Sequence, residues 1–114
     1  MTFRLLLVFA VGAAACASSH EVCTPPTTDV CPSVVPSFAT EVLPILNQRC
    51  NNCHSPEVDG GPWPLDTQQN VKDWAPDLIK DLKACSMPPP GSAQMPIAER
   101  DKLWAWLICG APDN

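Results

Sequence analysis

Five consecutive residues, Cys50-Asn51-Asn52-Cys53-His54, carry the clearest chemical signal in this sequence. Two thiols at C-x-x-C spacing can each form a thioether bond with a vinyl group of one haem, and a histidine that follows them can bind the haem iron. The pentapeptide therefore predicts one covalently attached haem c per chain. Cys50 and Cys53 are the expected thioether residues, and His54 is the expected proximal ligand of the iron.

Two other chemistries also use a C-x-x-C pair. A thioredoxin-like redox pair is expected on a βαβ scaffold, and the sequence contains no strand-rich stretch. A zinc site needs four ligands at defined spacing, but the sequence has no second C-x-x-C, and its other histidine is His20, which we expect to be solvated. A structural or zinc-binding envelope lipoprotein without haem is therefore kept as an alternative.

The first 16 residues resemble an export signal rather than part of a fold. An apolar run over residues 5–11, too short to span a bilayer with margin, precedes small residues at 12–15. Cys16 follows as in a bacterial lipobox, although Ala13 stands where such boxes usually carry leucine. We expect a signal peptide over 1–16 and a lipid-anchored protein on the periplasmic side of a bacterial membrane. An ordinary secretory cleavage is the alternative.

The cysteine count fits an exported protein. Of seven cysteines, Cys16 is assigned to lipid and two to haem, and this leaves four: Cys23, Cys31, Cys85 and Cys109. Thiols in an oxidising compartment normally pair, and four cysteines allow three connectivities. We expect Cys23–Cys31 and Cys85–Cys109, because the members of each pair lie within one segment.

The charge of the chain restricts its partners. The full chain has a net charge of −5, which argues against nucleic acid because phosphate binding needs clustered Lys and Arg. A redox partner protein with a basic docking patch is favoured instead. Asp73, Asp77 and Asp81 recur at four-residue spacing, as a solvated face or, less commonly, as a docking patch. No nucleophile–base pair and no carboxylate dyad stands out, so we expect no catalytic role.

Proline, threonine and serine dominate residues 17–36, which predicts an extended tether before a compact domain over 37–114. Apolar spacing in that domain predicts an all-α fold with helices over 37–49, 67–84 and 97–109. Ser37 and Asp66 resemble N-caps. Pro44 and Pro76 are expected to kink or split the first two helices, and Gly110 to end the last one.

The iron needs a sixth ligand or an open site, and two methionines follow the motif. Met87 precedes three prolines that stiffen the backbone beside its sulfur, whereas Met95 lies just before the last helix. A thioether is a soft ligand that favours reduced iron and raises the potential.

The order of these parts resembles the class-I-type monohaem cytochrome c family. Helix, C-x-x-C-H, loop, helix, Met-Pro loop and a last helix with Leu103-x-x-Trp106-Leu107 occur in that order over residues 37–112. The resemblance implies a small cytochrome-c-like domain wrapped around one haem. It implies Met87 as the distal ligand and Met95 as core packing.

The resemblance also assigns supporting roles. It implies that Trp63 packs against the haem and that Trp106 packs on the first helix near Phe38 or Val42. It places the carbonyl of Pro62 or Pro64 where it can accept the other ring N–H of His54. The chain departs from the family in three ways. Met87 follows His54 by only 33 positions, which is short. Ile97 stands where a Ser or Thr usually caps the last helix, and Cys85 and Cys109 are not general features of the family.

These expectations together describe an electron-transfer protein with His/Met axial ligation. A haem-based sensor or peroxidase-like domain is the alternative if the sixth ligand is displaceable.

Overall fold

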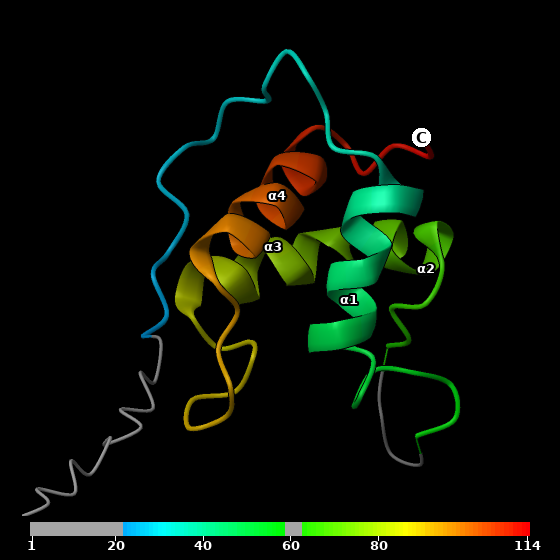
Figure 1. Cartoon of the computed structure of the whole chain (residues 1–114), viewed down its shortest axis with the longest axis vertical. Coiled ribbons are helices and arrows are strands. Elements are labelled where there is room, and N and C mark those ends of the chain that lie inside the picture. The colour runs from blue at the N-terminus through cyan, green and yellow to red at the C-terminus, as the bar shows by residue number, and fades with distance from the viewer. Residues whose placement is uncertain (1–21, 59–62) are drawn as a thin grey trace, which may run out of the picture.

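The computed structural model describes residues 22–58 and 63–114, and every regular element within these ranges is a helix (Figure 1). The elements are η1 (Phe38–Val42), α1 (Leu43–Arg49), α2 (Gln68–Asp73), α3 (Ala75–Ala84) and α4 (Ile97–Ile108). The all-α prediction is confirmed for this part of the chain. The expected signal over 1–16, Cys16, His20 and Pro62 lie outside the described residues. No helix in the described ranges is both long and apolar enough to cross a membrane.

Two prolines divide the helices as predicted. Pro44 lies in the first turn of α1, after the π-helical turn η1, and Pro76 lies in the first turn of α3. A proline is tolerated there because the first N–H groups of a helix have no partner within the helix. Trp74 separates α2 from α3.

The cap of α2 differs from the prediction by one residue. Thr67, not Asp66, is the N-cap: its backbone is extended and its side chain accepts the N–H of Asn70. The Asp66 carboxylate instead accepts a bond from the Asn70 side-chain amide at 2.9 Å. Both residues can cap, and the extended backbone at Thr67 decides which one does.

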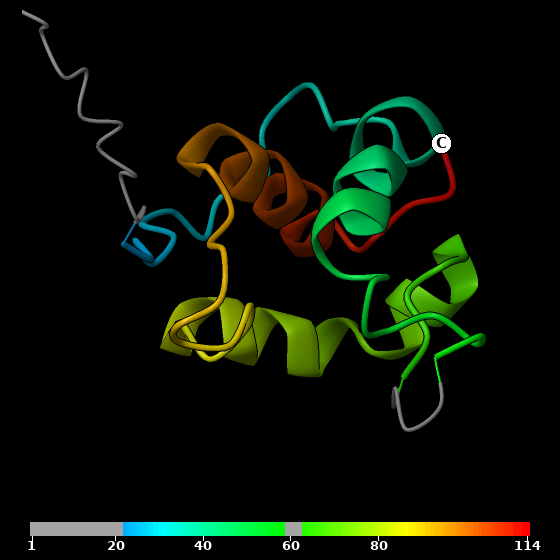
Figure 2. The ribbon, with the colours of Figure 1, turned by 60° about the horizontal axis from the view of Figure 1, so that its bottom comes forward.

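Helix α4 forms the centre of the core. It packs against both η1 and α3, and Figure 2 shows α3 running below α4 and α1. The rings of Phe38 and Trp106 lie 5.2 Å apart, so the predicted contact between the first and last helices is confirmed. Gly110, with φ of 91°, follows α4 in the left-handed conformation that commonly ends a helix.

Residues 22–36, here called the strap, lie on the helical domain as an extended segment (Figure 1). Disulfides join Cys23 to Cys85 and Cys31 to Cys109. The predicted pairs Cys23–Cys31 and Cys85–Cys109 are therefore wrong, and Cys23 and Cys31 instead fasten the extended strap to the helical domain.

The path of the chain explains the pairing. An extended strap advances about 3.3 Å per residue, so eight residues carry Cys31 far beyond the distance at which it could bridge to Cys23. The twelve residues of α4 span about 18 Å and likewise keep Cys85 away from Cys109. Each strap cysteine instead meets a helix end, with Cα–Cα distances of 5.9 and 5.1 Å, within the range that a disulfide needs.

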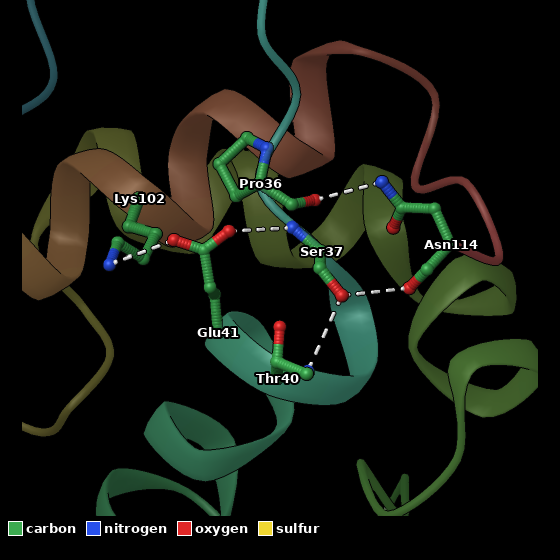
Figure 3. Close-up of polar contacts among 6 residues, drawn as sticks. All are labelled: Pro36, Ser37, Thr40, Glu41, Lys102 and Asn114. Atoms are coloured by element: carbon green, nitrogen blue, oxygen red, sulfur yellow. Dashed lines mark hydrogen bonds and ion pairs between the residues drawn. The ribbon is translucent and has the colours of Figure 1, made fainter.

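A polar cluster joins the start of η1 to α4 and to Asn114 (Figure 3). Ser37 caps η1 by accepting the Thr40 N–H, and its hydroxyl donates to the Asn114 carbonyl at 3.0 Å. The Asn114 side chain accepts from the Phe38 N–H at 2.9 Å. Glu41 accepts the Ser37 N–H at 2.9 Å and forms an ion pair with Lys102 at 3.1 Å. This cluster ties the start of the first helix to α4 and to residue 114.

Glu41 should make this cluster sensitive to acid. The Ser37 N–H, and then Lys102, hold the pKa of the Glu41 carboxyl below its usual range. A lowered folded-state pKa gives stability that is present above the unfolded-state pKa and is lost as the pH falls through the folded-state value. We therefore predict that Glu41→Gln lowers the free energy of unfolding at pH 7, and that the difference from wild type vanishes in acid.

Urea unfolding between pH 3 and pH 7 measures this effect. Glu57→Gln, at an exposed glutamate, is the matched control and should show no such pH-dependent difference. A Glu41→Gln deficit that is constant over this range would contradict the assignment.

Candidate functional site

The pentapeptide forms a tight turn at the end of α1. The N–H of Cys50 donates to the Leu46 carbonyl at 2.8 Å, which completes the last helical turn. The N–H groups of Cys53 and His54 then donate to the Cys50 carbonyl at 3.1 and 3.0 Å. The chain folds back on itself here, so both thiols and the imidazole are presented close to one helix end.

The loop that follows is fastened onto this turn. The Leu65 N–H donates to the His54 carbonyl at 2.8 Å, and the Asn51 side-chain amide donates to the Leu65 carbonyl at 3.0 Å. The same amide donates to the Asn47 side chain at 2.8 Å. Asn51 therefore has a positioning role that the sequence analysis missed, because nothing in the C-x-x-C-H pattern constrains its intervening residues.

One cavity of about 420 Å³ adjoins this turn, and its volume falls within the range of ligand sites in proteins. All six of the predicted haem-site side chains line it: Cys50, Cys53, His54, Trp63, Met87 and Met95. The other lining residues are mostly apolar and come from α1, α3, α4 and the neighbouring loops: Arg49, Val58, Leu65, Trp74, Asp77, Leu78, Asp81, Leu82, Pro88, Pro89 and Leu103. The motif and the two methionines, which are 33 or more positions apart in the sequence, thus meet at one site.

The two motif cysteines differ from the other described cysteines in their bonding. Cys50 and Cys53 carry free thiols, whereas the other four are paired in disulfides. Burial raises the pKa of the Cys50 thiol to about 11, with Arg49 acting in the opposite direction. Cys53 is exposed. Both sulfurs are therefore available for a covalent bond, and Cys50 is a protonated thiol at neutral pH.

This difference predicts unequal alkylation in chain prepared without any cofactor. Because the thiolate is the reacting species, Cys53 should be labelled by iodoacetamide much faster than Cys50 at pH 8. Labelling of Cys50 should rise steeply as the pH approaches 11. Peptide mass spectrometry after short labelling times measures both rates, and equal rates at pH 8 would contradict the burial of Cys50.

The two methionines occupy different settings on the cavity wall. Met95 is 3% exposed and belongs to the hydrophobic core, as expected for a packing residue, whereas Met87 is 37% exposed. The Met87 sulfur is therefore the one carried by a surface loop rather than by the core.

Hydrogen bonds on both sides hold the Met87 loop. Before it, Ser86 donates from its N–H to the Asp81 carbonyl at 3.0 Å and from its hydroxyl to the Asp81 carboxylate at 2.6 Å. After it, the Gln94 side-chain amide donates to the carbonyls of Pro88 and Pro89 at 3.3 and 3.2 Å. Hydrogen bonds thus join the start of the loop to the end of α3, and join Gln94 near the end of the loop to Pro88 and Pro89 near its start.

Helix α3 contributes more of the wall than the sequence analysis assigned to it. Trp74 lies 5.4 Å from Trp63, ring centre to ring centre, and Leu78 and Leu82 continue its line along the helix. The signal was present in the sequence as an i, i+4, i+8 apolar spacing. Asp77 and Asp81 also border the cavity, so two members of the acidic row lie at this site.

Arg49 links the motif to the last helix. Its guanidinium forms a two-point ion pair with the Glu99 carboxylate, at 2.7 and 3.1 Å. Planar two-point pairs fix geometry as well as charge. The residue just before Cys50 is therefore anchored to α4.

Within residues 22–58 and 63–114, no three His, Cys, Asp or Glu side chains are grouped in a way that could hold a metal ion. The zinc alternative thus receives no support from the described residues. Comparisons with protein-family models, curated proteins and solved structures find no match for this chain. The function must therefore be inferred from the site.

Proposed function

We propose that this protein is an electron carrier that holds one covalently attached c-type haem in the 420 Å³ cavity. One observation supports this most strongly. Among the six cysteines in the described residues, the two that stay out of disulfides are those of the C-x-x-C-H motif, and they line the same cavity as His54 and Met87. An apolar cavity with two available thiols, an imidazole and a thioether on its wall fits the chemistry of this group.

Each residue has a distinct role in this proposal. Cys50 and Cys53 form the thioether bonds, His54 is the proximal ligand and Met87 the distal ligand. Bound haem supplies one-electron exchange between Fe(III) and Fe(II). If His54 and Met87 both held the iron, no coordination site would be left for a substrate, and the neutral thioether would favour the reduced iron.

The surroundings serve electron transfer rather than catalysis. Buried apolar side chains, among them Leu82, Leu103 and Met95, exclude water from the inner wall and lower its dielectric constant. Trp63 is about half exposed and would cover part of the outer edge. Asp77 and Asp81 at the border would attract a partner with a basic docking patch.

The cellular setting remains part of the proposal. The two disulfides are compatible with an exported protein. Lipid attachment at Cys16 and a periplasmic location would keep the carrier at a membrane surface. Electron exchange would then take place between proteins confined to the same envelope.

Exposure of Met87 favours one second candidate. A distal ligand on a partly exposed loop can leave the iron more readily than a core residue. The domain would then act as a haem-based sensor or a peroxidase-like domain with a displaceable sixth ligand. The hydrogen bonds from Ser86 and Gln94 oppose this by holding the loop, which is why electron transfer is the leading proposal.

Optical spectra of holoprotein test the ligand assignment. Oxidised wild type should show a Met–iron charge-transfer band, and reduced wild type should bind carbon monoxide slowly at neutral pH. Met87→Ala should lose the band and bind carbon monoxide rapidly, because its sixth position is open. Met95→Ala, the matched control, should keep the band. It should lose about 2–5 kcal/mol in its free energy of unfolding, because the truncated side chain leaves an empty space in the core.

Loss of the band in Met95→Ala but not in Met87→Ala would assign the ligand to Met95. Rapid carbon monoxide binding by wild type would replace the electron carrier with the sensor.

A further inference from the structure

Helix α4 carries a buried cation directly beside one disulfide. Arg100 is 2% exposed. Its Nη1 donates to the Thr24 carbonyl at 2.7 Å and contacts the sulfur of Cys23, and the sulfur of Cys85 lies 3.9 Å away. The Nε and Nη2 atoms of Arg100 are buried and have no hydrogen-bond partner among the described residues.

This arrangement leaves a positive charge without sufficient compensation. Burial lowers the pKa of the Arg100 guanidinium, with Asp101 opposing the shift, so the site disfavours the cation. A disulfide is neutral and offers it only weak acceptors. A thiolate at Cys23, whose sulfur Arg100 contacts, would instead carry the negative charge that a buried guanidinium lacks. The surroundings therefore stabilise the reduced form of this pair relative to an ordinary disulfide.

The other disulfide has a different environment. The sulfur of Cys31 lies 3.5 Å from the Pro32 carbonyl oxygen, whose partial negative charge disfavours a thiolate. No hydrogen bond recorded for the described residues brings a cation to the Cys31–Cys109 pair. The two bridges that fasten the strap are thus electrostatically unequal.

Cys23–Cys85 is also accessible and close to the proposed ligand. Both cysteines line a second cavity of about 830 Å³, together with Arg49 and residues 90–94, so a small reductant can reach them. Cys85 caps α3 with a left-handed φ of 54°, a conformation that a residue with a side chain rarely adopts without being held. It lies two positions before Met87.

We propose that Cys23–Cys85 is a redox-active disulfide, opened selectively by a dithiol, and that its opening releases the loop that carries Met87. The loss of Met87 from the iron rests on the proposed function, whereas the selective opening of the disulfide does not depend on it.

The exchange balances with one dithiol. A thiolate of the dithiol attacks one sulfur of the pair, the Cys23–Cys85 bond breaks, and a mixed disulfide forms while the other cysteine leaves as a thiolate beside Arg100. The second thiol of the dithiol displaces the remaining cysteine. The dithiol is oxidised by two electrons to a disulfide. One of its two protons ends on Cys85 and the other passes to solvent, so Cys23 remains a thiolate beside Arg100. Cys31–Cys109 keeps the strap attached, so the loosening is confined to the Met87 loop.

Graded dithiothreitol buffers test the selectivity on the full chain. After equilibration, iodoacetamide traps the free thiols, and peptide mass spectrometry reports the reduced fraction of each pair. Cys23–Cys85 should open at an equilibrium constant at least about tenfold more favourable than Cys31–Cys109, about 30 mV in potential. Arg100→Gln should narrow this gap, whereas Lys102→Gln, which removes a cation from the same helix, should preserve it.

If the two disulfides of the wild-type protein open together, or if Cys31–Cys109 opens first, the proposal is overturned. This test needs no variant, so it holds whether or not Arg100→Gln folds. A gap unchanged by Arg100→Gln in a folded variant would overturn the role of the cation.

The effect on the loop is read on the trapped holoprotein, after removal of dithiol and reoxidation of the iron with ferricyanide. The Met–iron band should be lost when Cys23 and Cys85 are alkylated. Cys23→Ser/Cys85→Ser should lack the band without any reductant, and Cys31→Ser/Cys109→Ser should retain it. A band that survives opening would overturn the release of Met87. A chain that carries no haem at all would refute the proposed function. The labelling experiment would still decide whether Cys23–Cys85 opens selectively.

Discussion

The structure depends on one constraint, which is that one side of its hydrophobic core, formed by Leu65, Leu82, Met95 and Leu103, faces an open cavity instead of other side chains. The end of α1, the inner face of α3, the Met87 loop and Leu103 of α4 all border the same 420 Å³ space. A domain of this size buries too little surface to be comfortably stable by side-chain packing alone. A large, mostly apolar group bound in the cavity would complete the core, so the proposed cofactor would have a structural as well as a redox role.

The strap supplies stability that the small core lacks. Its two disulfides join residues 62 and 78 positions apart, and the loop-closure model gives each about 4 kcal/mol through the unfolded state. The strap also covers α4, where the Trp104 indole N–H donates to the Thr28 carbonyl and Trp104 is almost fully buried. The cysteines that stabilise the fold are thus separated from the two that remain available to the cavity.

Features set by neighbouring residues could be predicted from the sequence. The Ser37 cap, the breaks at Pro44 and Pro76 and the turn at Gly110 follow from local backbone chemistry. The choice between Asp66 and Thr67 could not be predicted, because both can cap and only the backbone geometry separates them.

Features set by the path of the chain were missed or wrong. The disulfide pairing failed because sequence proximity does not report that the strap runs extended along α4. The strap also buries Trp104, a contact between segments distant in the sequence. Met87 and Met95 lie with the motif on one cavity, and the roles of Asn51 and Arg100 follow only from their contacts in the fold.

The most direct test of the central claim is whether haem stays attached to the denatured chain. The full chain is produced together with c-type haem maturation proteins, denatured, extracted with acidic solvent and weighed by intact mass spectrometry. The account predicts one haem retained per wild-type chain and none in Cys50→Ala/Cys53→Ala, with both disulfides present in each. A wild-type chain that emerges without haem, with Cys50 and Cys53 still open to alkylation, would contradict it.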